Sequence, residues 1–292
     1  MILHPETQHD PKRSIPFYSG DSDLSVSSWR YSWKQRCGET ICINPESDRF
    51  HLAEKWAPNY YHWMHDILSC LVIRQFAEID APKIKSVTLC EDAIQVGHVR
   101  DWLGILGIEH VERGDQGVLN GSCHVEYDTR FSGLVHPEAL KLFRRFCREN
   151  SKSPKHILVQ RNRGGGDCDK SRNLQNRDSI IGLFRKSGID LQMVFLEGMP
   201  VANQIELFSN AEVIVGVHGA GFANLTFCNP ECRVIEVASP VFYNESYANI
   251  ASLVGIRFAT VKGYGPMEAC SYNQPVSVDP VILLDILSIL GQ

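Results

Sequence analysis

The chain has no long hydrophobic segment, although 43% of its 292 residues are hydrophobic. No apolar run reaches the roughly 18–20 residues that a bilayer-spanning helix needs. The N-terminal stretch, MILHPETQHDPKRSIPFYSG, is polar and interrupted by proline, so it resembles neither a signal peptide nor a membrane anchor. We therefore expect no transmembrane segment, and either a cytoplasmic protein or one domain cut from a longer protein.

The chain also lacks a surplus of positive charge. Lys and Arg number 29 against 34 Asp and Glu, which gives a net charge of −5. A protein whose main partner is a nucleic acid backbone usually carries a basic surplus that displaces counterions. The composition therefore argues against nucleic acid as a partner.

The ten cysteines show no paired CxxC spacing. Cys228 and Cys232 (CNPEC) are the closest pair, and no nearby CxxC or HxxxH completes a zinc set. We expect reduced structural thiols, with a disulfide between these two cysteines as the alternative.

The C-terminal half alternates short apolar strands with helices. This pattern is typical of a parallel sheet covered by helices, and it predicts a doubly wound α/β domain. The strands are expected at 156–161, 191–198, 212–219, 232–239 and 256–263, and the helices at 177–187, 201–209, 243–254 and 279–290, with a short turn or helix at 221–227.

The N-terminal half is less regular, but it also reads as α/β or α+β. Strands are expected at 39–44 and 86–91, and helices at 59–76, 99–107 and 136–150. The polar, proline-containing segment SKSPK (151–155) is the best domain boundary. We predict an N-terminal domain over 1–152 and a C-terminal domain over 153–292, with the last helix packing back onto the first domain.

A glycine-rich segment, GVHGAGFAN (216–224), follows the buried strand EVIVGV. Its glycines allow a sharp turn and a close approach of the backbone to a ligand. A helix beginning near Gly221 would direct its free N–H groups at a phosphate, and His218 could donate to a phosphate oxygen. Asn224 could cap the turn or hold the ligand. The alternative is an ordinary strand-to-helix turn in which His218 is merely exposed.

Glu236 lies at the end of the next strand, so we expect it beside the same crevice. A carboxylate in that position can accept both hydroxyls of a ribose. The alternative is an acid that forms a salt bridge with a neighbouring arginine.

The loop RNRGGGDCDKSRNLQN (161–176) places four basic residues, Arg161, Arg163, Lys170 and Arg172, among glycines. Arginine suits a diphosphate because its guanidinium presents a planar fork of donors. Arg161 directly follows a strand and is the strongest candidate, with Arg172 and Asn176 next. The loop could instead be a solvated basic segment, in which Asn176 caps the following helix.

The segment NYYHWMHDIL (59–68) places His62 and Asp66 one helical turn apart, on one face. Such a pair can act as a base and the group that orients it. Zinc is a rival interpretation, because His65 adds a second histidine, but the spacing is not that of an HExxH site. A helix whose histidines satisfy hydrogen bonds in the core is the third.

Together these motifs resemble glycosyltransferase family 61 over roughly residues 56–240. The resemblance is carried by N-Y-Y-H-W-x-x-D, an R…R-x-L-x-N loop, and G-x-H-G-A-G-x-x-N followed by V-I-E. It implies a GT-B fold, with two Rossmann-like domains facing across a cleft. It also implies a nucleotide-sugar donor, usually UDP-linked, inversion at the anomeric carbon, and no required metal or other cofactor.

The family's functional residues match positions of this chain. The histidine and acid match the catalytic candidates His62 and Asp66. The donor-binding candidates are Arg161, Arg172, Asn176, His218, Gly219, Ala220, Gly221, Asn224 and Glu236. Two departures are that the chain reads DILSCLVIR where members often have D-x-h-P-R, and that GGGDCDK is inserted in the basic loop, which affects the alignment of Arg163 and Arg172.

The expected reaction is a single in-line displacement that moves xylose or N-acetylglucosamine onto a glycan or lipid-linked glycan hydroxyl. Asp66 is the preferred base, with His62 orienting it or contacting the donor phosphate; the reverse assignment is the alternative. Because the chain is short and lacks a secretory anchor, we expect a bacterial or viral enzyme in the cytoplasm or at the periphery of a membrane.

Two other functions remain open at this stage. One is a non-catalytic protein that binds nucleotide sugars. The other is an NAD-type oxidoreductase, although no G-x-G-x-x-G lies in a first strand–helix turn with an acid about 20 residues later.

Overall fold

The structure, a computed structural model, describes residues 2–3, 47–52, 57–76, 83–114, 123–124, 135, 137–161, 172–241, 244–265 and 274–292. The chain forms two compact units. The C-terminal unit comprises Met1–Thr7 and Phe146–Gln292, and the N-terminal unit comprises Gln8–Arg145. The division thus falls earlier than the predicted boundary after residue 152, and the first residues of the chain belong with its C-terminal half.

The C-terminal unit is built on a six-stranded sheet with the order β1-β10-β9-β8-β6-β7. All neighbouring strands are parallel except β1 and β10, which are antiparallel. Each strand predicted in this half is present, and the two-residue β1 was not expected. The strands are β1 (Ile2–Leu3), β6 (His156–Gln160), β7 (Gln192–Phe195), β8 (Val213–Val217), β9 (Arg233–Ala238) and β10 (Arg257–Lys262).

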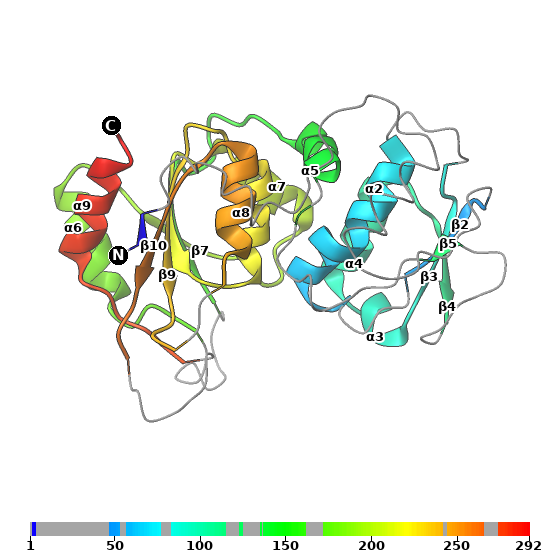
Figure 1. Ribbon diagram of the computed structural model, residues 1–292, viewed down its shortest axis with the longest axis horizontal. Helices are drawn as coiled ribbons and strands as arrows, with labels where there is room; N and C mark the ends of the chain where they lie inside the picture. The colour runs from blue at the N-terminus through cyan, green and yellow to red at the C-terminus, as the bar shows by residue number, and fades with distance from the viewer. Residues whose placement is uncertain are drawn as a thin grey trace, which may run out of the picture. The chain divides into compact units, whose positions relative to one another are not determined.

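Helices cover both faces of this sheet, which confirms the predicted doubly wound arrangement. Helices α6 (Arg177–Lys186) and α9 (Pro280–Ile289) lie on one side, and α7 (Val201–Asn210) and α8 (Ser246–Val254) lie on the other (Figure 1). The 3-10 helix η5 (Ala220–Phe227) follows β8. On the side of α6 and α9 the core is a buried hydrophobic cluster from strands and helices, including Leu158, Val215, Ile235, Ala259, Phe184 and Leu283.

The last helix, α9, packs within the C-terminal unit. Its residues Leu283, Ile286 and Leu287 belong to the buried cluster of the sheet, and the helix contacts α6 and β9. Its buried apolar side is thus used on the sheet of its own unit, and packing back onto the first domain stays a prediction. Asp279 caps the helix by accepting a hydrogen bond from the Val281 amide at 2.9 Å.

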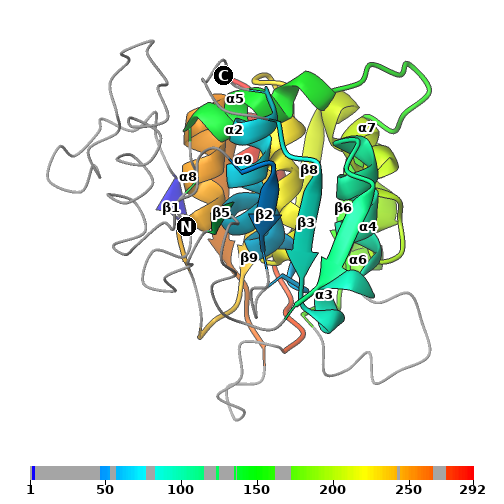
Figure 2. The same ribbon diagram turned by 90° about the vertical axis from the view of Figure 1, so that its right-hand side faces the viewer.

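The N-terminal unit contains a parallel four-stranded sheet with the order β4-β3-β2-β5. Strands β2 and β3 run side by side in Figure 2. The unit consists of β2 (Arg49–His51), the π-helix η1 (His62–Leu68), α2 (Ser69–Phe76), β3 (Ser86–Leu89), α3 (Glu91–Ile94), α4 (Gly97–Ile105), β4 (His110–Arg113), β5 (Cys123–His124) and α5 (Pro137–Phe143). Two α/β units with parallel sheets confirm the predicted fold class; the cleft between them stays a prediction. The strand predicted at 39–44 lies outside the described residues.

The segment 136–150 forms a shorter helix than predicted. A 3-10 turn, η3 (Arg144–Phe146), ends α5, and the next residues leave the helix because α7 binds their backbone. The Asn150 amide donates to Asn210 Oδ1 at 2.8 Å, and Asn210 Nδ2 donates to the Arg148 carbonyl at 2.7 Å. Side chains from a distant helix thus replace the hydrogen bonds that continued helix would have supplied.

The cysteines with described side chains carry free thiols. Cys228 and Cys232 are buried, Cys90 and Cys147 are partly exposed, and the alternative disulfide between the first two is not formed. None of the helices in the described part of the chain combines the length and the apolar character needed to cross a membrane.

Candidate functional site

The carboxyl ends of β6, β8 and β9 lie at one edge of the C-terminal sheet, where ligands bind in doubly wound folds. Arg161 directly follows β6 and His218 directly follows β8. Glu236 lies within β9, where it is in register with Gly216 of β8 and Thr260 of β10. The sheet topology therefore brings together three candidates that are far apart in the sequence.

Arg161 lies against the glycine-rich segment. A Cβ atom added to Gly219 would lie 3.5 Å from Arg161 Nη1 and 3.6 Å from its Cδ, so the guanidinium reaches the start of η5. The Arg161 amide donates to Asn173 Oδ1 at 3.1 Å. Arg161 Nε lies 3.9 Å from Glu197 Oε1, but both side chains are partly exposed (34% and 46%), so this pair neutralises little of the positive charge.

Arg172 converges on the same place. Its Nη1 donates to the His218 carbonyl at 3.2 Å. Burial and the nearby Glu236 carboxylate raise the pKa of the Tyr247 hydroxyl, while the charges of Arg172 and Arg161 oppose this shift. Both guanidinium groups therefore act on the surroundings of Tyr247. The structure thus gathers Arg161, Arg172 and His218, as predicted from the sequence.

His218 and Glu236 form a buried pair, with His218 Nδ1 2.5 Å from Glu236 Oε1. Their side chains are only 5% and 1% exposed. Glu236 Oε2 accepts a hydrogen bond from Thr260 Oγ1 at 3.1 Å. The His218 ring packs on Tyr247 with ring centroids 4.9 Å apart. Both carboxylate oxygens of Glu236, which was predicted to bind the ribose, thus have protein partners.

Two glycines of the motif are needed because of packing. A Cβ atom at Gly216 would lie 2.9 Å from the Phe222 ring, and one at Gly221 would lie 2.6 Å from Leu196 Cδ1. Gly219 is extended and precedes η5, which begins at Ala220, close to the predicted helix start. The predicted strand-to-helix turn at the sheet edge is confirmed; phosphate binding by Gly219, Ala220 and Gly221 remains a prediction.

Two predicted donor ligands, Asn224 and Asn176, have structural hydrogen bonds. Asn224 is fully buried, and its Nδ2 donates to Gln204 Oε1 at 2.9 Å and to the Gly221 carbonyl at 3.1 Å. Asn176 Nδ2 donates to the Val278 carbonyl at 2.7 Å, and its side chain makes no cap hydrogen bond to α6. These contacts shape the loops around the site. Arg163 and Lys170 lie outside the described residues.

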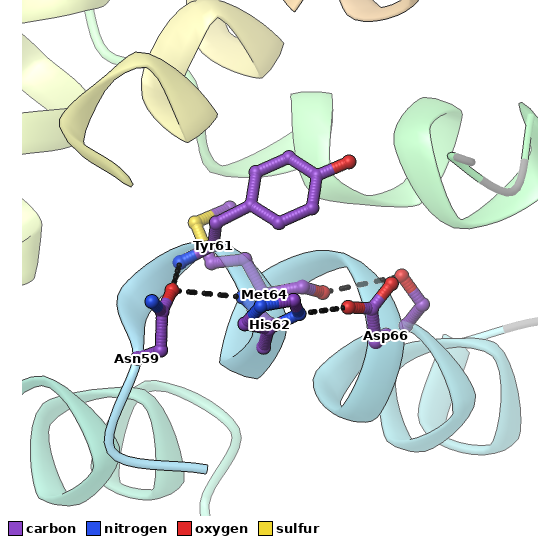
Figure 3. Close-up of polar contacts among 6 residues, drawn as sticks. Asn59, Tyr61, His62, Met64 and Asp66 are labelled. Atoms are coloured by element: carbon purple, nitrogen blue, oxygen red, sulfur yellow. Dashed lines mark hydrogen bonds and ion pairs between the residues drawn. The ribbon is translucent and has the colours of Figure 1, made fainter. Parts of the chain in front are cut away.

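In the N-terminal unit, His62 Nδ1 lies 2.6 Å from Asp66 Oδ2 (Figure 3). The predicted pairing across one helical turn is therefore confirmed. Asn59 precedes the helix, and its Oδ1 accepts from the Tyr61 amide at 3.0 Å and the His62 amide at 3.4 Å. The His62 side chain is 18% exposed and that of Asp66 only 3% exposed.

The helix that carries this pair is a π-helix over His62–Leu68, a geometry often found at functional sites. Ser69 Oγ donates to the Met64 carbonyl at 3.2 Å, which gives this backbone acceptor in the π-helix a partner. His65 is fully buried and packs on Tyr61 and Phe143, with ring centroids 5.1 and 6.3 Å away. Within the described residues, no three His, Cys, Asp or Glu side chains gather as metal ligands would.

Sequence reasoning missed Tyr247 and Thr260. Tyr247 lies in the first turn of α8, the helix that follows β9, and Thr260 is the in-register partner of Glu236 on β10. A polar residue in a predicted central strand, and an aromatic residue at the start of the helix after it, are the signals that could have identified them.

The chain is similar in structure to E. coli heptosyltransferase WaaC with ADP, with 11% identity, a TM-score of 0.35, and coverage of 70% of this chain and 72% of that chain. For WaaC with ADP-2-deoxy-2-fluoro heptose the identity is 9%, the TM-score 0.41, and the coverage 82% and 98%.

In sequence, the chain is 30% identical over 92 residues to the EGF domain-specific O-linked N-acetylglucosamine transferase of Drosophila melanogaster, which covers 31% of this chain and 18% of the relative. It is 30% identical over 73 residues to a beta-1,2-xylosyltransferase of Arabidopsis thaliana, covering 25% and 14%. The chain thus matches less than a fifth of the length of either relative.

The family model for glycosyltransferase 61 matches residues 60–235, more than half of the chain. The matched region begins beside His62 and Asp66 and includes the basic loop and the whole glycine-rich segment. The family resemblance and the enzyme class expected from the motifs are thereby confirmed. This chain belongs to the glycosyltransferase 61 family.

Proposed function

We propose that this protein transfers a sugar from a nucleotide sugar to a glycan hydroxyl, with inversion at the anomeric carbon. The convergence of Arg161, Arg172 and His218 at one sheet edge carries this proposal. Arg161 lies against Gly219, and Arg172 donates to the His218 carbonyl. Three groups able to carry positive charge or donate hydrogen bonds suit a diphosphate, whose negative charge grows as it leaves.

The nucleotide and the sugar are narrower parts of the proposal. UDP as the nucleotide follows from the family resemblance, and xylose or N-acetylglucosamine as the sugar follows from the names of the two sequence relatives. The acceptor would be a glycan or a lipid-linked glycan. We also propose a reaction without a metal, and a cytoplasmic location.

For the acceptor side, we assign His62 as the base and Asp66 as the group that orients it. The sequence favoured the reverse, but Asp66 is almost fully buried and its Oδ2 is engaged by His62 Nδ1. His62 is the more exposed partner, and its other ring nitrogen, Nε2, lies on the edge of the ring away from Asp66. A histidine held in this way can take a proton from an attacking hydroxyl.

The reaction would then be one displacement. The acceptor oxygen forms a bond to the anomeric carbon as the bond to the diphosphate breaks, and the hydroxyl proton moves to His62 Nε2. Arg161, Arg172 and His218 would stabilise the charge that develops on the departing diphosphate.

The first test is the thermal stability of the purified protein with UDP, ADP, GDP, UDP-sugars and NAD(P), with and without EDTA. A ligand that binds only the folded state at 100 times its Kd stabilises it by about 2.7 kcal/mol. Stabilisation by UDP and one UDP-sugar, unchanged by EDTA, is expected. A response to NAD(P) alone would refute the proposal, and loss of the response with EDTA would refute its metal-independent part.

A second test removes the Arg161 guanidinium from the candidate donor site. Arg161→Ala should lower kcat/KM by an amount that corresponds to about 2–4 kcal/mol of lost transition-state stabilisation, as the loss of an oxyanion donor does. Arg185→Ala is the control, because the Arg185 side chain on α6 is exposed and pairs with Asp190. Near-normal turnover in the Arg161 variant would remove this residue from the diphosphate site.

A further inference from the structure

Glu236 lies in an unusual place for an acid. Among the residues that the structure describes, Asp66 and Glu236 are the two buried carboxylates. Glu236 is 0% exposed and lies on β9, between β8 and β10 in the sheet. A buried carboxylate is costly unless donors or a positive charge compensate it. Its partners therefore indicate why the fold tolerates it.

The sheet register supplies these partners. Glu236 is paired with Gly216 on one side and with Thr260 on the other. Thr260 donates its hydroxyl to Oε2, and His218, next to the end of β8, meets Oε1. The arrangement leaves the carboxylate only 1% exposed, so a ribose would have to displace an existing partner to reach it.

We propose that Glu236 is a positioning residue that acts through His218, and that it does not bind the ribose. It fixes the His218 ring through Nδ1, so that the ring keeps one orientation beside Arg161 and Arg172, where the diphosphate of the donor would bind. This inference rests on the proposed function, because it assumes that a diphosphate binds beside Arg161 and Arg172.

The geometry restricts the His218 ring from several sides. Its backbone amide donates to the Val237 carbonyl at 3.0 Å, its own carbonyl accepts from Arg172, and its ring packs on Tyr247. With Nδ1 held by Glu236, Nε2 is the nitrogen on the opposite edge of the ring. A carboxylate that holds one imidazole nitrogen sets the direction and the proton content of the other.

The test measures binding of UDP, 2′-deoxy-UDP, uridine and pyrophosphate by titration calorimetry. Glu236→Gln keeps the shape and removes the charge. We expect roughly ten- to hundredfold weaker binding of UDP and pyrophosphate, the usual worth of a hydrogen bond to a charged group, with uridine unchanged. Arg185→Ala is the control, because the Arg185 side chain is exposed and pairs with Asp190; its pyrophosphate affinity should match that of the wild type.

The ribose alternative predicts a different pattern. If Glu236 binds the ribose, Glu236→Gln would weaken uridine as much as UDP and would abolish any preference for UDP over 2′-deoxy-UDP. That result would overturn the inference. A preference unchanged by the substitution would support it.

A double-mutant cycle tests whether Glu236 acts through His218. In a His218→Gln background, Glu236→Gln should have no further effect on pyrophosphate affinity. An equal loss in both backgrounds would mean that Glu236 acts independently of the histidine, and the inference would fall.

A ligand-free readout separates this inference from the proposed function. The imidazole N–H of His218 should give a protected proton NMR signal that disappears in His218→Gln and shifts in Glu236→Gln. Failure of the wild type to bind any nucleotide would refute the proposed function, while absence of this signal would refute the pair itself. If Glu236→Gln does not fold, Glu236→Asp takes its place. It keeps the charge but shortens the reach to His218 Nδ1, so the His218 signal should shift and pyrophosphate should bind more weakly with uridine unchanged; weaker uridine binding would again overturn the inference.

Discussion

The two buried carboxylates of the described structure each hold a histidine, but the two pairs differ in exposure. In the N-terminal unit, His62 is 18% exposed above an almost buried Asp66. In the C-terminal unit, both His218 and Glu236 are nearly inaccessible, at 5% and 1%. The same chemical pair can therefore serve two purposes. A partly exposed histidine can exchange a proton with a substrate, whereas an enclosed one is suited to keep a fixed orientation.

The pairs also differ in how the chain builds them. His62 and Asp66 are four residues apart on one helix, and Asn59 anchors the start of that helix. His218 and Glu236 are 18 residues apart on adjacent strands, and they meet because of the sheet register. A substitution in the helix that carries His62 and Asp66 should therefore break only that pair. A substitution that disturbs the packing of the sheet should break the pair of His218 and Glu236.

The largest expected effect comes from removing His62, the partly exposed histidine. His62→Ala should lower kcat by about 10²–10⁴-fold, the usual contribution of a general base, and leave the Kd for UDP unchanged. Added imidazole should restore part of the activity, because it can enter the space left by the side chain. Steady-state kinetics and calorimetry provide the two measurements.

Asp66→Asn is the matched variant for this experiment. It should also lower kcat, because the amide no longer fixes the tautomer of His62, but imidazole should not restore activity. If Asp66→Asn were inactive while His62→Ala kept near-normal turnover, the roles would be reversed and Asp66 would be the base.

The next effect tests the packing beneath the enclosed pair. Gly216→Ala should destabilise the protein by about 1–3 kcal/mol, typical of overpacking, and should weaken UDP binding. The new Cβ would lie 2.9 Å from the Phe222 ring and 3.1 Å from the Val159 carbonyl, and backbone atoms cannot easily move aside. Urea unfolding and UDP titration measure the two quantities.

Gly182→Ala in α6 is the control, because nothing lies within 4 Å of the new Cβ. It should raise the free energy of unfolding by roughly 0.5–1 kcal/mol, since glycine is unfavourable inside a helix. Equal destabilisation by both substitutions would contradict the packing argument.

A smaller effect is expected from a larger side chain at Gly219, which lies beside Arg161. At Gly219 a Cβ would make ordinary contacts with Arg161, at 3.5–3.6 Å, so Gly219→Ala should fold and bind UDP nearly as the wild type does. Gly219→Val should displace the guanidinium and weaken UDP binding by roughly tenfold, which corresponds to one charge-assisted hydrogen bond. Unchanged UDP affinity in the valine variant would separate Arg161 from the diphosphate.

The smallest effect involves a third histidine, His98. Burial lowers the pKa of His98 from 6.5 to about 4, and the Ala57 backbone and Asp101 only partly oppose this. Between these values the unfolded chain binds a proton that the folded protein does not. The free energy of unfolding should therefore fall as the pH drops from about 6.5 toward 4, by at most about 1.4 kcal/mol per pH unit.

His98→Phe should flatten this slope, because phenylalanine does not bind a proton. The variant should keep its packing, since phenylalanine can retain the edge-on contact with Tyr60, whose ring centroid lies 5.1 Å from that of His98. Chemical unfolding at several pH values measures it. An unchanged slope would assign the acid sensitivity to other groups.

The sequence allowed prediction of whatever depends on short spacing or on strand ends. The four-residue spacing predicted the contact between His62 and Asp66, and the ends of two buried strands predicted that Arg161 and His218 share one edge. The roles of Glu236, Asn176 and Asn224 depended on partners from distant segments: Thr260, Val278 and Gln204. Strand register and loop packing choose those partners, and neither is written in local residue patterns.

Helix ends show the same division. Gly188, with a φ of 83°, follows α6 at the place expected from the sequence. The helix over Pro137–Phe143 ends early because Asn150 and Asn210 bond to each other's segments, a contact between residues 60 positions apart. Local stop signals are visible in a sequence, whereas competition from a remote helix is not.

The buried thiols of Cys228 and Cys232 can report how often the surrounding structure opens locally. Both lie at 0–1% exposure just after η5, the helix that begins at the glycine-rich segment. A thiol reagent can modify them only when this part of the C-terminal unit opens, so the labelling rate of their peptide reports the free energy of that local opening. A nucleotide bound beside His218 should lower this labelling rate, without any label being placed on the site itself.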